Sequence, residues 1–117
     1  MKDARLRSSL LCLHATLVER ERREYEKAHG RTASGEFLQA LLSDPSLAWL
    51  SPLTALVARL DELAEDAPAA QRSCRARVRA MLTGGGRAGF AEKYAERLDH
   101  DPDLAFAHAA ALHALRA

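Results

Sequence analysis

The chain has 117 residues, of which 48% are hydrophobic and 28% are charged, so it can bury one core but is too short for two. Its formal net charge of +1 argues against a long-range field that would steer it to nucleic acid or to an anionic membrane. Aromatic residues make up only 5% of the chain and alanine is abundant, which is typical of packed helices. We therefore expect one all-helical domain over residues 1–117.

The first predicted helix spans residues 2–29. Four leucines recur in it at helical spacing, and two neighbours widen their apolar stripe: Leu6, Leu10, Leu13 and Leu17, with Leu11 and Val18. Its second half, residues 19–27, is a dense run of both charge signs, which we interpret as a solvated face. The pair His29-Gly30 provides the helix stop.

The second and third helices follow clear start signals. Ser34 is the expected cap of the second helix, which ends at Asp44-Pro45 because a residue before proline is pushed out of the helical region. A short turn at residues 47–50 follows, and Ser51-Pro52 predicts a hydroxyl cap with proline at the first helical position. The predicted buried faces are Phe37, Leu38, Leu41 and Leu42 in the second helix, and Leu53, Leu56, Val57, Leu60, Leu63 and Ala64 in the third.

Three further helices are predicted, over residues 69–82, over residues 88–99, and from Asp101-Pro102 to the end of the chain. Five or six helices with short connections favour an antiparallel bundle or a compact array. The segment Asp44–Trp49 resembles Asp101–Phe106, which is consistent either with an old duplication or with a shared way of ending one helix and starting the next.

A few polar residues fall on the apolar stripes, and they are the candidate site. The set is His14, Glu21, Tyr25, Asp61 and His108. If their helices are neighbours, His14, Asp61 and His108 converge, and the leading interpretation is a hydrogen-bonded polar cluster in the core. Partial exposure without convergence, a metal or ligand site built from imidazole and carboxylate groups, and acid–base catalysis are the alternatives.

Other features bear on partners and location. The fourth helix carries Arg72, Arg75 and Arg79 on one face, but without interleaved aromatic residues a solvated face is favoured and nucleic acid is not an expected partner. Cys12 and Cys74 are expected to be free thiols. With no apolar run near the roughly 18 residues of a membrane span, a cytoplasmic protein is expected.

The functional hypothesis is a non-enzymatic protein that acts through self-association or a protein partner, with no catalytic residue and no cofactor. Trp49, Leu50 and Phe106 are its candidate interface residues if they are exposed, because large apolar groups on a surface mark contacts. The alternative is a small metal- or ligand-binding bundle that uses the inward histidines and carboxylates.

The chain also resembles a family of small all-helical bacterial proteins without an assigned activity. The resemblance is carried by Tyr25-Glu26, Gly30, Gly35–Leu42, Asp44-Pro45, Ala48-Trp49-Leu50, Pro52-Leu53, Asp61-Glu62, Asp101-Pro102 and His108. It implies a helical fold and a bacterial origin, and it implies no catalytic residue.

Overall fold

The computed structural model describes residues 2–62, 67–84 and 88–116, and these residues form six α-helices and one short 3-10 helix with no strand. The elements are α1 (Lys2–His29), α2 (Ser34–Ser43), the 3-10 helix η1 (Pro45–Leu50), α3 (Ser51–Glu62), α4 (Pro68–Leu82), α5 (Ala88–His100) and α6 (Pro102–Arg116). The predicted all-helical fold is confirmed.

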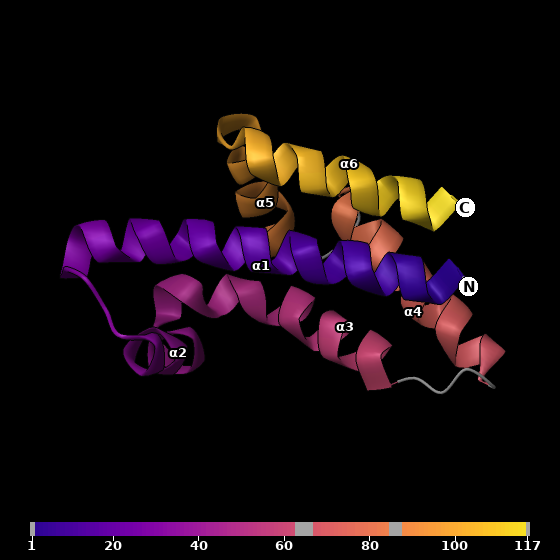
Figure 1. The fold of residues 1–117 in the computed structure, drawn as a ribbon, viewed down its shortest axis with the longest axis horizontal. Coiled ribbons are helices and arrows are strands. Elements are labelled where there is room, and N and C mark those ends of the chain that lie inside the picture. The colour runs from indigo at the N-terminus through magenta and orange to yellow at the C-terminus, as the bar shows by residue number, and fades with distance from the viewer. Residues whose placement is uncertain (1, 63–66, 85–87, 117) are drawn as a thin grey trace.

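The long helix α1 is the centre of the array (Figure 1). It packs between α6 and α3, and both run antiparallel to it. Helices α4 and α5 lie behind this layer, where α4 packs on α3 and α6 and α5 packs on α6 and η1. Because α1 has neighbours on two sides, its flanks meet different helices, and this decides which polar residues can meet.

The apolar stripe of α1 forms the middle of the core. Its four leucines are at most 1% exposed: Leu6, Leu10, Leu13 and Leu17. Val18 packs against this core as predicted, but Leu11 is 45% exposed, which corrects its assignment to the stripe. One residue turns the helix by about 100°, so Leu11 points away from the direction of Leu10.

Helix α2 is peripheral, and only part of its predicted face is covered. Phe37 and Ala40 are buried, whereas Leu38 and Leu42 are 59% and 78% exposed. The helix packs mainly on η1, with Phe37 against Tyr25 of α1. A helix with so few neighbours buries a narrow stripe, so the predicted inward positions of Leu38 and Leu42 are wrong. Ala33, rather than Ser34, occupies the N-cap position, without a side-chain hydrogen bond.

The start of α3 also differs from the prediction. Ser51 has helical angles (φ −53°, ψ −43°), so the chain passes from η1 directly into α3 and Ser51 is not an N-cap. The cap lies earlier, at Asp44, whose Oδ1 accepts hydrogen bonds from the Ser46 amide at 2.9 Å and from its hydroxyl at 2.8 Å. Leu63 and Ala64, predicted to be inward, lie outside the described residues.

The two Asp-Pro segments share a local structure. Asp101 caps α6 as Asp44 caps η1, because its Oδ1 accepts from the amides of Asp103 and Leu104 at 3.0 and 3.2 Å. Leu47 and Leu104 are both buried. The aromatic residues that follow differ, since Trp49 packs on the core and Phe106 is 80% exposed.

In the described part of the chain, no helix by itself has the length and apolar character needed to cross a membrane. Gly35–Ser43 and Pro45–Glu62, which meet at an 82° bend, reach those limits by length and composition only when they are taken as a pair.

Candidate interaction surface and polar centres

His14 and Asp61 lie at the contact between α1 and α3, but they have different partners. His14 Nε2 lies 2.9 Å from the Thr54 hydroxyl, and burial lowers the pKa of His14. Asp61 lies 3.8 Å from Arg7 Nε, and its side chain is 66% exposed. Because these two contacts are seven residues apart on each antiparallel helix, they lie about 10 Å apart along the helix axes.

His108 faces α5. The Tyr94 hydroxyl is hydrogen-bonded to His108 Nδ1 over 2.7 Å. Burial raises the pKa of Tyr94, so its hydroxyl keeps its proton at neutral pH, and burial lowers the pKa of His108. The pair is a neutral hydrogen bond between α5 and α6 and has no contact with the His14 pair.

The predicted convergence of His14, Asp61 and His108 is therefore not formed. Residues 7 and 14 of α1 face α3, whereas α6 packs on the opposite flank of α1 and turns His108 toward α5. Among residues 2–62, 67–84 and 88–116, no three His, Cys, Asp or Glu side chains gather so that they could hold a metal ion.

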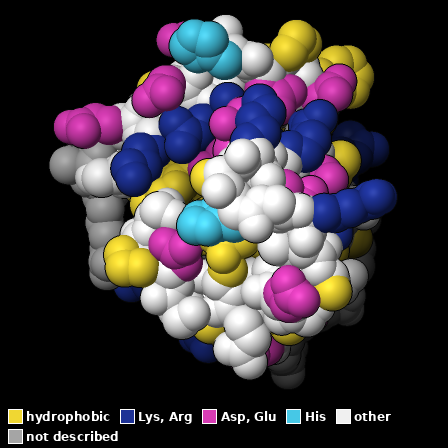
Figure 2. Space-filling model, turned by 90° about the vertical axis from the view of Figure 1, so that its left-hand side faces the viewer, with side chains coloured by type: hydrophobic (Ala, Val, Ile, Leu, Met, Phe, Trp, Pro, Cys, Tyr) yellow, Lys and Arg dark blue, Asp and Glu magenta, His cyan; other side chains and the backbone are white. Residues whose placement is uncertain are grey.

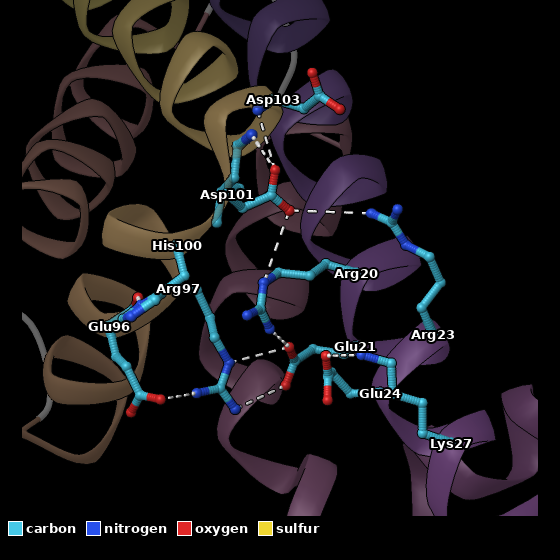
Figure 3. A network of polar contacts seen from close by, with 11 residues as sticks. Arg20, Glu21, Arg23, Glu24, Lys27, Glu96, Arg97, His100, Asp101 and Asp103 are labelled. Atoms are coloured by element: carbon cyan, nitrogen blue, oxygen red, sulfur yellow. Dashed lines mark hydrogen bonds and ion pairs between the residues drawn. The ribbon is translucent and has the colours of Figure 1, made fainter.

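Glu21 is the centre of a different polar network, which joins α1 to α5 (Figure 3). It is 4% exposed, and its carboxylate lies 3.0 Å from Arg20 Nη1. Arg97 donates to both of its oxygens at 3.1 Å, and this hydrogen bond raises the pKa of Arg97. The Arg97 guanidinium also lies 5.4 Å from the centre of the Trp49 ring.

The same network reaches the start of α6. Arg20 Nε lies 3.7 Å and Arg23 Nη2 4.0 Å from Asp101 Oδ2, so Arg20 bridges Glu21 and Asp101. Figure 2 shows this end of the molecule, where Lys, Arg, Asp and Glu side chains crowd together. The charged half of α1 is thus partly a docking surface for α5 and α6, which corrects the interpretation of residues 19–27 as a solvated face.

The sequence pattern did not single out Arg20 or Arg97. Both lie in charge-rich helices, where an inward arginine has the same local sequence signature as an outward one. Tyr25, predicted in the polar set, takes no part in the network. It stacks on His29 with ring centres 4.2 Å apart and packs edge-on against Phe37.

The three candidate interface residues have different environments. Leu50 is 2% exposed and belongs to the core. Trp49 is half-buried and packs on Phe90, with ring centres 5.7 Å apart. Phe106 alone of the three is open to solvent, with 80% of its surface exposed, so only this residue keeps the predicted role.

Phe106 lies at the edge of a groove between α1 and α6. The groove has a volume of about 440 Å³ and a mostly apolar floor of small side chains. Its walls are Ser8, Ser9, Cys12 and Thr16 from α1, and Asp103, Phe106, Ala107 and Ala110 from α6. A large exposed ring beside a hollow lined by small residues provides both a knob and a hole for a partner.

The arginine row of α4 is partly used within the fold. Arg75 and Arg79 donate to the carbonyl oxygen of Leu115 at 2.9 and 3.2 Å. Cations at the carboxyl end of a helix satisfy its last carbonyl groups and favour its dipole. Two of the three arginines of the predicted basic face therefore hold the end of α6.

Comparisons of the chain with models of protein families, with curated proteins and with solved structures give no significant match. The resemblance to a bacterial family accordingly stays a prediction, and the functional argument rests on the geometry.

Proposed function

We propose that this chain is a non-enzymatic, cytoplasmic interaction module that binds a protein through the face formed by α1 and α6. The observation that carries the proposal is Phe106, which is 80% exposed at the edge of a groove of about 440 Å³ with a mostly apolar lining. Leaving a phenyl ring in water forgoes roughly 2 kcal/mol of burial energy, which a partner recovers on binding.

The polar residues favour this proposal over an enzyme. His14 and His108 each have one ring nitrogen, and Glu21 both carboxylate oxygens, hydrogen-bonded to another side chain of the fold. Such pairs fix how helices are aligned, and none of them opens into the groove. The metal- or ligand-binding alternative has no specific observation in its favour, because it depended on the convergence of His14, Asp61 and His108.

The test is photo-crosslinking in the cells that produce the protein. A photoreactive phenylalanine analogue at position 106 is expected to give covalent protein adducts. The same analogue at position 42 is the matched control, because Leu42 is 78% exposed on α2 and lies outside the groove. Absence of adducts at position 106, or the same adducts at both positions, would contradict the proposal.

A further inference from the structure

The register of α1 and α6 determines which residues share a level on the groove. The contact between Arg20 and Asp101 puts these residues side by side, and antiparallel helices keep the same rise per residue. Eight residues further along each helix, Cys12 lies at the level of Ala109. Phe106 and Ala110, which both line the groove, therefore lie on opposite sides of that level, about 4.5 Å and about 1.5 Å away along the helix.

The charge on the exposed face of α1 changes sign across the level of Cys12. Arg5, Cys12 and Glu19 are seven residues apart, so they form one exposed stripe in which opposite charges flank Cys12 at about 10 Å on either side. Among the described residues, Glu19 pairs with Arg22 on its own helix, at 4.0 Å. The other two arginines within one turn, Arg20 and Arg23, are directed to Glu21 and Asp101.

One charge of α6 follows the same pattern. Asp103 is exposed, lines the groove and lies six residues before Ala109, at the end near Glu19. The α1–α6 face therefore has an anionic end with Glu19 and Asp103 and a basic end with Arg5, with the groove and Phe106 between them.

From this pattern we propose that the partner of the α1–α6 face is a second copy of the chain, in a two-fold symmetric dimer. The axis lies in the interface, across both helices, at the level of Cys12 and Ala109. The inference rests on the proposed function and identifies its partner. In this arrangement Arg5 lies opposite Glu19 of the second copy, and Phe106 lies opposite the hollow beside Ala110 of the second copy.

The charges distinguish this arrangement from the other two-fold packing of the same face. An axis parallel to the helices would place α1 against α6 of the second copy at equal levels. Glu19 of each copy would then face Asp103 of the other, so like charges would meet twice at the anionic end. An axis across the helices pairs opposite charges at both ends and sets the two Cys12 side chains near each other.

The area of the face predicts the strength of the dimer. The face is about 21 Å long from Arg5 to Glu19 and about 20 Å wide across α1 and α6. The area that two such faces bury is below the roughly 1,200 Å² of a stable complex. We expect a reversible dimer that forms at high micromolar concentration. Sedimentation velocity over a wide concentration range is therefore the first measurement.

The sharpest test reverses the two charges separately. Arg5→Glu and Glu19→Arg are each expected to weaken self-association by about fivefold to tenfold, because each replaces two attractive contacts by two repulsive ones. Mixed in equal amounts, the two variants restore the contacts in a heterodimer, which is expected to form as readily as the wild-type dimer. Leu42→Ser, which removes an exposed apolar residue from another face, is expected to leave association unchanged.

A short bismaleimide provides the second readout. Cys12 is exposed and Cys74 is buried, so a link between folded chains has to pass through Cys12. We expect linked dimers in the wild type, few in Phe106→Ser, and none in Cys12→Ser. Circular dichroism confirms that each variant is folded.

The outcomes separate this inference from the proposed function. A chain that stays monomeric at every concentration, or a dimer that gives no Cys12 link and no recovery on mixing, overturns the two-fold dimer. If position 106 still crosslinks to other proteins in cells, the interaction module stands with a different partner. If it crosslinks to nothing, both proposals fail.

Discussion

Arg97 on α5 forms a bidentate ion pair with Glu21 on α1, and its Nε and Nη2 each lie 3.1 Å from a different carboxylate oxygen. The Glu21 side chain is 4% exposed and the Arg97 side chain 19%. Removing one partner of a buried pair leaves a charge that the interior cannot solvate, which costs more than the pair contributes. We therefore expect single substitutions at the Glu21–Arg97 pair to destabilise the fold strongly.

Arg97→Met is expected to lower the free energy of unfolding by about 2 to 3 kcal/mol, because Arg20 is then the one remaining cation that pairs with Glu21 in the described part of the chain. Arg97→Lys keeps the charge but loses the bidentate hydrogen bonds of the guanidinium, so a smaller loss of stability is expected. The double variant Glu21→Leu with Arg97→Met should recover most of the stability, since no buried charge remains. Urea denaturation measures the free energy of unfolding of all three variants, and Arg72→Met, at an exposed arginine, is the control. Equal losses of stability in Arg97→Met and Arg72→Met would contradict the prediction.

Two half-buried histidines, His14 and His108, predict a loss of stability on mild acidification. Burial lowers the pKa values of His14 and His108 in the folded chain, so the unfolded chain binds more protons as the pH falls through their usual value of 6.5. Stability is full above that value and decreases below it, until the folded chain also takes up the protons.

Thermal unfolding between pH 7.5 and pH 5 measures this decrease, and His14→Asn with His108→Gln is expected to flatten it. A wild-type Tm that rises on acidification would contradict the prediction.

Asp101 combines a helix cap with an ion pair, and two substitutions separate these roles. Asp101→Asn keeps the acceptor for the amides of Asp103 and Leu104 but loses the charge that faces Arg20. Asp101→Ala loses both, and we expect it to cost about 1 kcal/mol more than Asp101→Asn. Chemical denaturation of the two variants measures the difference. If the two variants lose the same amount, the cap contributes nothing to the stability of α6.

The two thiols are expected to react at very different rates. Cys12 is exposed and Cys74 is 4% exposed, so the native protein should react with one equivalent of a thiol reagent quickly. Cys74 should react only when the chain opens, so its rate should increase with urea concentration. Fast reaction of two thiols in the native protein would contradict the burial of Cys74.

The fold could be predicted from the sequence because its signals are local. Each helix has an apolar stripe of its own, and proline and glycine mark the boundaries, so the element bounds follow from residues near one another in the chain. The errors concern residues whose burial depends on helices far away in the sequence. Leu38 and Leu42 satisfy the helical pattern as well as Phe37 does, but α2 has too few neighbours to cover them.

The candidate site depended on a relation that the sequence does not contain. Periodicity places His14 and His108 on apolar faces, but it does not state which helix covers each flank. Only the packing of α1 between α3 and α6 decided that these histidines bond to Thr54 and Tyr94 and not to a shared partner. The same packing turned Glu21 and Arg97 toward each other across 76 residues of chain.

The sequence by itself determined the helical class, the approximate bounds of the helices and most of the core, because helix formation and amphipathic burial depend on spacing within one segment. The tertiary structure alone decided which polar residues meet, and that Phe106 is exposed beside a groove while Trp49, in the equivalent local segment, packs on the core. The physical reason is that a side chain's exposure and partners are set by the neighbouring helices, whose arrangement is a property of the whole chain.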